Sequence, residues 1–194
     1  MRSGQKLVWA ALFLALLQAG FLGWMIVSRA AVLRDGREVV LKVEPIDPRD
    51  LLRGDYVILN YDISWIPLAM IVDQDELRSR MDGPGKMTVR LGQNADGYWQ
   101  AKNAWIGNAP SSAPGKDEVD IVGRFSALNR LYSREVRVTY GIERYYLPEG
   151  EGRAIERDMR IRDFSVRVAV AASGQAQIKA LMDEGKVLFE EPLY

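Results

Sequence analysis

The hydrophobic pattern divides the chain into one apolar N-terminal run and a longer region of alternating segments. The run 7–27 contains no charged residue. At about 1.5 Å per residue, a helix of this length crosses a hydrocarbon core of about 30 Å. Trp9 and Trp24 lie near its two ends, where interfacial aromatic residues are enriched. The pattern predicts a single transmembrane helix within residues 1–29, ahead of an extramembrane domain.

A cleaved signal peptide is the alternative interpretation of this run, because Ser28-Arg29-Ala30 has the small-x-small pattern of a cleavage site. The apolar run is longer than the roughly 7–15 residues of a signal peptide, which favours an uncleaved signal anchor. Basic residues precede and follow the run, so the positive-inside count is nearly balanced. A short N-terminal tail ahead of such a run usually stays cytoplasmic. We therefore expect residues 30–194 to be extracytoplasmic, in the periplasm of a Gram-negative cell, with the anchor in the inner membrane.

The clearest strand pattern beyond the anchor is the stretch 56–63. Its odd positions are apolar or aromatic and are predicted to face the core, and its even positions to face the other side. The preceding Arg53-Gly54-Asp55 is typical of a tight turn, in which Asp55 can bond backbone amides or pair with Arg49 or Arg53. These residues either fix the entry of the strand or form a charged ligand-binding corner with Tyr56.

The pattern Val-x-Leu-x-Tyr-x-Ile at 57–63 recurs as Val-x-Val-x-Tyr-x-Ile at 136–142, an offset of 136 − 57 = 79. A second piece, Val89-Arg90-Leu91, recurs as Val166-Arg167-Val168, an offset of 166 − 89 = 77. Because the pieces keep their order and nearly one offset, the sequence predicts an internal repeat. The alternative is that any two β-rich segments share such alternation.

The predicted fold class is α+β, mainly β, with an N-terminal transmembrane helix followed by two similar β-β-α-β-β halves. The first β-rich half spans 30–107, a Gly- and Pro-containing linker spans 108–115, and the second half spans 116–194. We expect the halves to pack with pseudo-twofold symmetry as a sandwich or open barrel. The expected elements are strands 39–43, 119–125 and 187–189, helices 73–81 and 150–159, and hairpins pairing 87–91 with 98–105 and 163–171 with 175–182.

Composition narrows the chemistry available to the domain. The chain has no cysteine and no histidine, which excludes disulfides, thiolate nucleophiles, histidine bases and histidine-ligated metals. It has 26 basic and 26 acidic residues; without Arg2, Lys6 and Arg29 the balance is 23 − 26 = −3. A mildly acidic domain is a poor match for a nucleic-acid binder. No cofactor and no metal site is predicted.

Two glutamates of the second half are candidates for chemistry. Glu143 follows the Tyr-x-Ile pattern, and Glu149 lies beside Glu151 before a predicted helix. They can act as acid–base groups or bind a divalent cation through oxygen. In the simpler interpretation Glu143 faces solvent or pairs with Arg144, and Glu149 and Glu151 lie in the first turn of the helix, where acids are favoured.

The aromatic residues Trp99 and Trp105 also have a structural and a functional interpretation. Alternation puts both on one face of a predicted strand, which favours core packing over an exposed platform. Tyr132, Tyr145 and Tyr146 are left ambiguous by the pattern.

The fixed positions of a known motif, GDYxxLxY, are all matched, by Gly54, Asp55, Tyr56, Leu59 and Tyr61. The chain resembles the GDYXXLXY family of bacterial membrane-anchored proteins over essentially its full length, including the block 140–150. Members are described as membrane-anchored and of unknown function. The resemblance therefore implies a location and transfers no catalytic residue.

The motif strand also faintly resembles a strand of signal peptidases, which use a Ser nucleophile beyond the anchor and a Lys base. No Ser-Met-x-Pro stretch follows residue 28, and Ser64 comes after the motif. Lys86 and Lys102 are candidates for the base only because they are lysines, and no motif supports either of them. The departure argues against a peptidase of this type.

An anchor without recognisable catalytic machinery favours a binding or accessory subunit of an integral membrane protein over an enzyme. The ligand- or partner-binding candidates are Arg49, Arg53, Asp55, Tyr56, Glu143 and Glu149. The rival hypothesis is an envelope enzyme that uses Asp55, Glu143 and Glu149, which requires these carboxylates to share one cleft.

Overall fold

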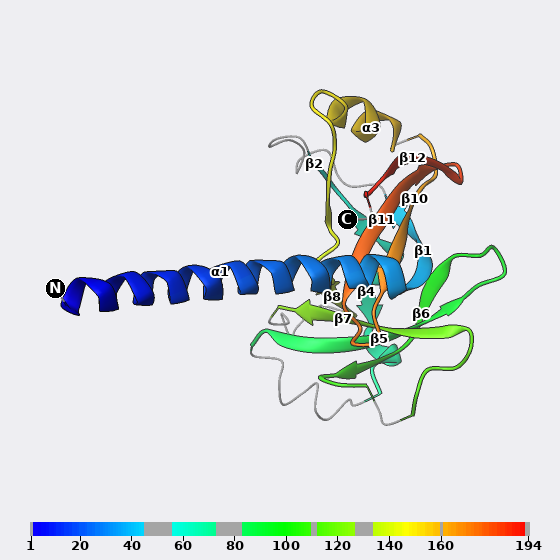
Figure 1. Cartoon of the computed structure of the whole chain (residues 1–194). Helices are drawn as coiled ribbons and strands as arrows, with labels where there is room; N and C mark the ends of the chain where they lie inside the picture. The colour runs from blue at the N-terminus through cyan, green and yellow to red at the C-terminus, as the bar shows by residue number, and fades with distance from the viewer. Residues whose placement is uncertain are drawn as a thin grey trace.

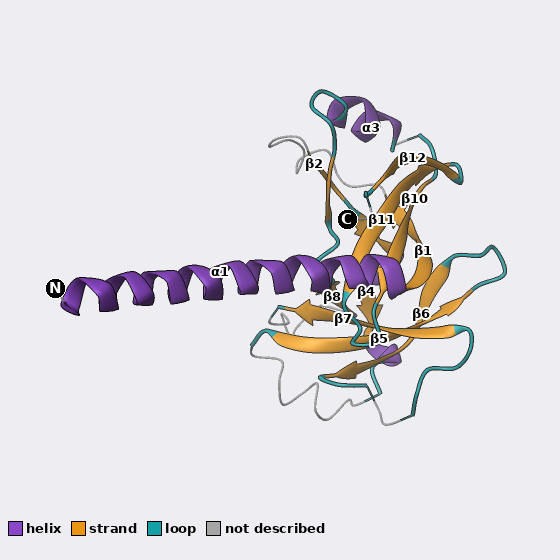
Figure 2. Ribbon diagram, in the orientation of Figure 1, coloured by secondary structure: helices purple, strands orange, loops and turns teal. Residues whose placement is uncertain are grey.

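The computed structural model places one long N-terminal helix against a domain made mainly of β-strands (Figure 1; Figure 2). It describes residues 2–44, 56–72, 83–109, 112–126, 134–159 and 161–192. The helices are α1 (Arg2–Asp35) and α3 (Gly152–Asp158), with 3-10 turns η2 (Asp62–Ser64) and η3 (Leu68–Met70). The strands are β1 (Arg37–Glu44), β2 (Tyr56–Ile58), β3 (Asn60–Tyr61), β4 (Trp65–Pro67), β5 (Gly85–Gln93), β6 (Trp99–Ile106), β7 (Glu118–Phe125), β8 (Glu135–Thr139), β9 (Arg144–Tyr146), β10 (Phe164–Val170), β11 (Ala176–Asp183) and β12 (Lys186–Glu190).

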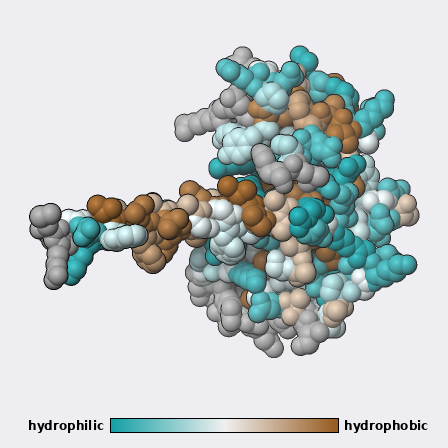
Figure 3. Space-filling model, in the orientation of Figure 1, coloured by the Kyte–Doolittle hydropathy of each residue, from teal (hydrophilic) through white to brown (hydrophobic). Residues whose placement is uncertain are grey.

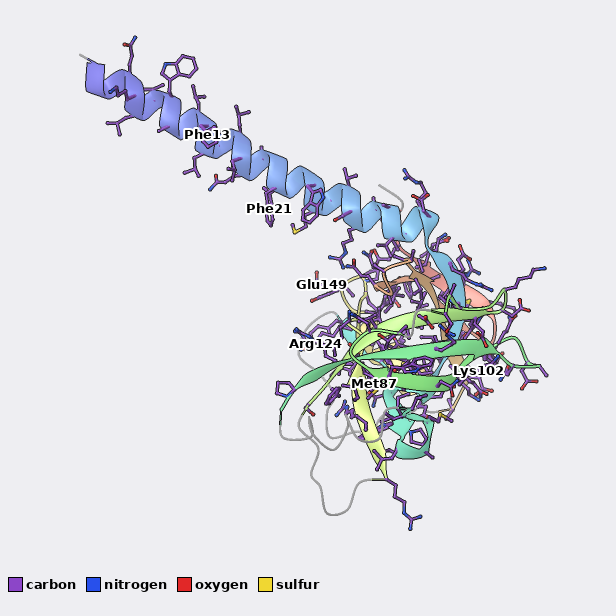
Figure 4. All side chains as sticks on the ribbon, turned by 90° about the horizontal axis from the view of Figure 1, so that it is seen from below. Phe13, Phe21, Met87, Lys102, Arg124 and Glu149 are labelled. Atoms are coloured by element: carbon purple, nitrogen blue, oxygen red, sulfur yellow. The ribbon has the colours of Figure 1, made fainter. Side chains whose placement is uncertain are left out.

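Helix α1 is unbroken and projects away from the domain (Figure 1). Its stretch Gly4–Asp35 is long and apolar enough to cross a membrane, and the domain buries none of its most apolar part. Figure 3 shows this apolar surface, and Figure 4 shows Phe13 and Phe21 on the free part of the helix. Exposed apolar side chains on all sides of a helix are expected where lipid is the solvent. The predicted N-terminal helix is confirmed, and it is compatible with membrane anchoring.

The last turn of α1 belongs to the domain. Val32 and Leu33 are buried, where the helix packs against β10 and β11. The Gly36 amide donates to the Val32 carbonyl over 2.9 Å, and β1 begins at the next residue. A side chain at Gly36 would collide with that carbonyl oxygen and crowd the Val170 amide and the Ala169 side chain. The chain therefore passes from helix to sheet in a single residue, without a flexible linker.

Within the residues that the structure describes, the domain contains two five-stranded sheets and one small two-stranded ladder. One sheet has the order β12-β11-β10-β1-β3, the other has the order β4-β8-β7-β5-β6, and β2 pairs with β9. The ladders between these named strands are antiparallel. In each five-stranded sheet a third strand lies beside a hairpin: β1 comes from the other end of the domain to lie beside β10, and β7, the next strand after β6, lies beside β5. Strand pairing thus ties the N-terminal and C-terminal parts of the domain together.

The two hairpins are paired alike. The register shifts between Arg90 and Leu91 in the β5–β6 hairpin, and between Arg167 and Val168 in the β10–β11 hairpin. These positions differ by 167 − 90 = 77. The third strand is also placed alike: the facing pairs are Val39 with Val168 and Leu41 with Val166 in one sheet, and Val119 with Leu91 and Ile121 with Val89 in the other.

The core contains the inward residues of both sheets. Val57, Leu59 and Tyr61 are fully buried and Ile63 nearly so, which confirms the face predicted from alternation. The stretch 56–63 is not one strand, however. β2 bonds to β9 and β3 bonds to β1, so the ladder is interrupted at Leu59, whose amide donates to the Glu143 carbonyl over 2.9 Å.

Other predicted elements differ in detail. Helix α3 begins at Gly152, so Glu151 precedes it and the prediction that Glu149 and Glu151 lie in its first turn is wrong. The predicted helix 73–81 lies outside the described residues. Trp99 joins the core, but Trp105 does not, although it too is buried. The bulge in the β5–β6 hairpin changes the alternation between these two residues, so they do not share a face.

Candidate functional site

The structure describes the motif only from Tyr56 onward. Gly54 and Asp55 lie outside the described residues, as do the candidates Arg49 and Arg53. Tyr56 opens β2, Leu59 follows it in the core, and Tyr61 ends β3. The geometry of the motif can therefore be analysed from its first tyrosine, Tyr56, to its second, Tyr61.

Tyr61 and Tyr140 make reciprocal hydrogen bonds. The Tyr61 hydroxyl donates to the Ile142 carbonyl over 2.5 Å, and the Tyr140 hydroxyl donates to the Ile63 carbonyl over 2.7 Å. Burial raises the pKa of both phenols well above 10, and the charge of Glu143 adds to this. Both groups are neutral donors at any physiological pH. The last motif residue thus joins two distant segments of the domain.

The backbone amides of these two tyrosines are also satisfied by side chains. Tyr61 N–H donates to Ser64 Oγ over 3.0 Å. Glu143 Oε1 accepts from Tyr140 N–H, and its Oε2 accepts from Gly141 N–H over 2.9 Å. Glu143 therefore fixes a turn, a role that differs both from acid–base or cation-binding chemistry and from the simpler interpretation of a solvent-facing or Arg144-paired side chain. This use of both carboxylate oxygens resembles capping rather than acid–base chemistry.

Asp62 is a carboxyl that the sequence pattern did not single out. Burial raises its pKa to about 6, with Glu44 adding to the shift while the Ile63 amide and Lys42 oppose it. Its Oδ1 is buried and has no hydrogen-bond partner among the described residues. The acid lies on the half-buried face of the motif stretch, directly after Tyr61. Alternation did not indicate that Asp62 is unusual, because polar residues are expected on the face of the stretch that points away from the core.

An aromatic patch covers the outward face of the β2–β9 ladder, and consists of Tyr56, Arg144 and Tyr146. Tyr56 and Tyr146 face each other in register, with ring centroids 5.8 Å apart. The Arg144 guanidinium lies 5.6 Å from the Tyr56 ring centroid, within cation–π range. Tyr146 is 69% exposed, whereas its neighbour Tyr145 is buried. Alternation along 144–146 could have predicted which tyrosine faces out, once β9 was recognised as a strand.

Tyr56, the first tyrosine of the motif, thus belongs to this patch, whereas Leu59 and Tyr61 lie in the core. The family model of the GDYXXLXY protein matches residues 18–181. The chain belongs to the GDYXXLXY family. The match runs from the middle of α1 into β11 and includes both members of the tyrosine pair. Neither a curated protein nor a solved structure matches the chain.

In this GDYXXLXY protein the described carboxylates do not converge on one cleft. Glu143 is bonded to backbone amides, and Glu149 is exposed on the loop before α3 (Figure 4). Asp55, the third carboxylate of the enzyme hypothesis, lies outside the described residues. Within the described ranges no cluster of three or more acidic side chains could hold a metal ion.

The peptidase-like residues are likewise engaged elsewhere. Ser64 is buried, and its hydroxyl accepts from the Tyr61 amide. Lys86 Nζ lies 2.9 Å from Asn108 Oδ1, and Lys102 Nζ lies 3.3 Å from Glu118 Oε1. A serine nucleophile needs a base within hydrogen-bond reach. The structure gives each of these three side chains a structural partner instead.

Proposed function

We propose that this GDYXXLXY protein is a single-pass, membrane-anchored binding or accessory subunit of an integral membrane protein. Its domain is extracytoplasmic, and in a Gram-negative cell it lies in the periplasm with α1 in the inner membrane. The short basic N-terminal tail supports this orientation, because such tails usually remain cytoplasmic. The helix continues through Ser28-Arg29-Ala30 into the domain, which supports an uncleaved anchor.

One observation carries the proposal: α1 enters the domain without a linker. A protein that needs only to be retained at a membrane can use a flexible tether, and Gly- or Ser-rich tethers leave orientation free. Here Val32 and Leu33 are buried against the sheet, and Gly36 turns the chain at once into β1. A stiff junction fixes which surface faces a neighbour in the same membrane. Such pre-organisation lowers the entropic cost of binding.

We also propose that the domain is an internal duplication, with halves 30–107 and 116–194. The matched bulges and third-strand registers of the two hairpins support it. Ion pairs support it too: Lys102 pairs with Glu118, and Lys179 pairs with Glu38, at offsets of 179 − 102 = 77 and 118 − 38 = 80. The reciprocal tyrosine bonds relate Tyr61 to Tyr140 as a twofold axis would.

Purification of the tagged full chain from native membranes in mild detergent tests the accessory role. We expect a stoichiometric complex with a protein that resists alkaline carbonate extraction, as an integral membrane protein does. A variant with a seven-residue Gly-Ser insert after Val27 should remain in the membrane but lose most of the complex. Its control carries seven helix-forming residues at the same place, about two helical turns, and should retain more. Recovery of the wild-type chain alone and monomeric would contradict the proposal.

A further inference from the structure

We propose that the aromatic patch of Tyr56, Arg144 and Tyr146 is the surface that binds the integral membrane partner, through a carboxylate-bearing extramembrane loop. This inference rests on the proposed accessory function and names its docking site. Three observations carry it: where α1 holds the patch, what the patch exposes, and which charges surround it.

The first observation is position. Figure 1 shows the yellow segment that leads into α3 on the side of the domain from which the free part of α1 projects. Figure 4 shows Glu149, three residues after Tyr146, on that same side, with Lys102 on the opposite side. Because α1 joins the domain without a linker, this side is held toward the membrane. Surfaces of other membrane proteins are the macromolecular surfaces that most readily reach it.

The second observation is chemistry. Tyr146 is 69% exposed, and Tyr56 and Arg144 complete a contiguous group on one ladder. Among the described residues, no ion pair or hydrogen bond engages the Arg144 guanidinium or the Tyr146 hydroxyl. Tyrosine and arginine dominate the energetically important positions of protein interfaces. A guanidinium presents a planar donor fork that matches a carboxylate in a bidentate bond, and a cation–π contact with a ring does not use these donors.

The third observation is charge, and it separates a protein loop from the lipid surface. The segment 144–151 has one arginine and two exposed glutamates, Glu149 and Glu151, a net of 1 − 2 = −1. An anionic bilayer surface would act on all three groups and repel the segment. A folded loop can place a single carboxylate opposite Arg144 and leave both glutamates in water. The charges therefore favour a protein partner.

A photo-crosslinking residue at position 146 of the full anchored chain, irradiated in native membranes, tests the inference. We expect one discrete adduct whose linked peptide, sequenced by mass spectrometry, lies in an extramembrane loop with Asp or Glu near the link. Arg144→Glu should lower its yield at least about tenfold, because a repulsive pair replaces an attractive one. Arg157→Glu reverses another exposed charge, on α3, and should leave the yield unchanged.

The photo-crosslinking residue placed at position 161 serves as the position control, because Ile161 is 79% exposed. It should give no such adduct. Linkage to lipid alone, an equal adduct from position 161, or indifference to Arg144→Glu would each overturn the docking site. If the detergent complex persists while position 146 gives no protein adduct, the patch is wrong and the accessory function stands. If the chain is monomeric in detergent, the accessory function itself fails. Near-UV circular dichroism of each variant checks that the domain is folded.

Discussion

At the scale of single residues, the main feature of this domain is the pair of reciprocal hydrogen bonds made by Tyr61 and Tyr140. Alternation correctly predicted that Tyr61 faces the core, because a period of two is a local property of the chain. Tyr140, at the equivalent position of the recurring pattern, is buried as well. Their hydroxyl partners could not be predicted. The acceptors Ile142 and Ile63 come from segments 142 − 61 = 81 and 140 − 63 = 77 residues away, and a hydroxyl in a sequence does not specify its acceptor.

We expect Tyr140→Phe to lower the free energy of unfolding by about 1–3 kcal/mol, because the buried Ile63 carbonyl loses its hydrogen-bond donor. Thermal or urea unfolding of the full chain in detergent, followed by tyrosine and tryptophan fluorescence, measures the change. Tyr146→Phe removes the same atom from an exposed ring and should change stability by less than about 0.5 kcal/mol. Equal effects of the two substitutions would contradict the proposed bond.

Asp62 predicts a pH dependence with a defined sign. Its pKa is about 6 in the folded protein, above the ordinary value of about 4 for an aspartate. The folded state therefore holds the proton more tightly, and the contribution of Asp62 to stability falls as pH rises from about 4 to about 6. Above pH 6 the charged carboxylate has its full cost, which solvent screening of this half-buried group reduces to about 1 kcal/mol.

Asp62→Asn removes this cost while keeping an oxygen for the Ile63 amide. We expect the variant to be more stable than the wild type by about 1 kcal/mol at pH 7 and to lose that advantage near pH 4. The unfolding midpoint of both proteins, measured from pH 4 to pH 7.5, gives the difference. Using the difference cancels carboxylates such as Glu38, whose pKa is lowered by Lys179 and which act in the opposite direction. A difference that stays constant with pH would rule out the assignment.

At the scale of elements, the sequence predicted most strands because their residues alternate in short runs between turn residues. It failed where an element depends on a partner. The stretch 56–63 looks like one strand, but its ends pair with β9 and β1, and the ladder is interrupted between them. The face of Trp105 was wrong for a related reason, since a bulge is invisible to a strict period of two.

The turn between β11 and β12 gives an element-scale prediction. Glu184 and Gly185 both have positive φ, of 48° and 78°, as the two central residues of a hairpin turn that favours Asn-Gly. A glutamate in this conformation is strained, whereas asparagine tolerates it. We expect Glu184→Asn to raise the free energy of unfolding by about 0.5–1 kcal/mol. Glu149→Asn, in an exposed loop, is the matched control, and a similar gain there would remove the turn as the cause.

At the scale of the whole molecule, the two five-stranded sheets share strands across the chain. The offsets of 77 and 79 led to the prediction of two similar halves, and they are a property of the sequence alone. Which hairpin each entry strand joins was not predictable, because hydrophobic alternation fits β1 equally well to β5 and to β10. In the structure β1 lies beside β10 and β7 beside β5, so each hairpin is completed by the other part of the chain.

This exchange predicts that neither part of the chain folds alone. A chain cut within 108–115 gives an anchored fragment that contains the β5–β6 hairpin without β7, and a second fragment that contains β10 and β11 without β1. Each hairpin then exposes a long apolar edge, and the reciprocal tyrosine bonds lose their acceptors.

We expect each fragment expressed alone to be degraded or aggregated. Expressed together, they should purify as one complex from the membrane, with amide exchange protection in β1 and β10 close to that of the intact chain. A second fragment that is soluble, monomeric and protected in β10 without its partner would show that the hairpin completes itself in another way, and would refute the shared-strand architecture as the source of stability.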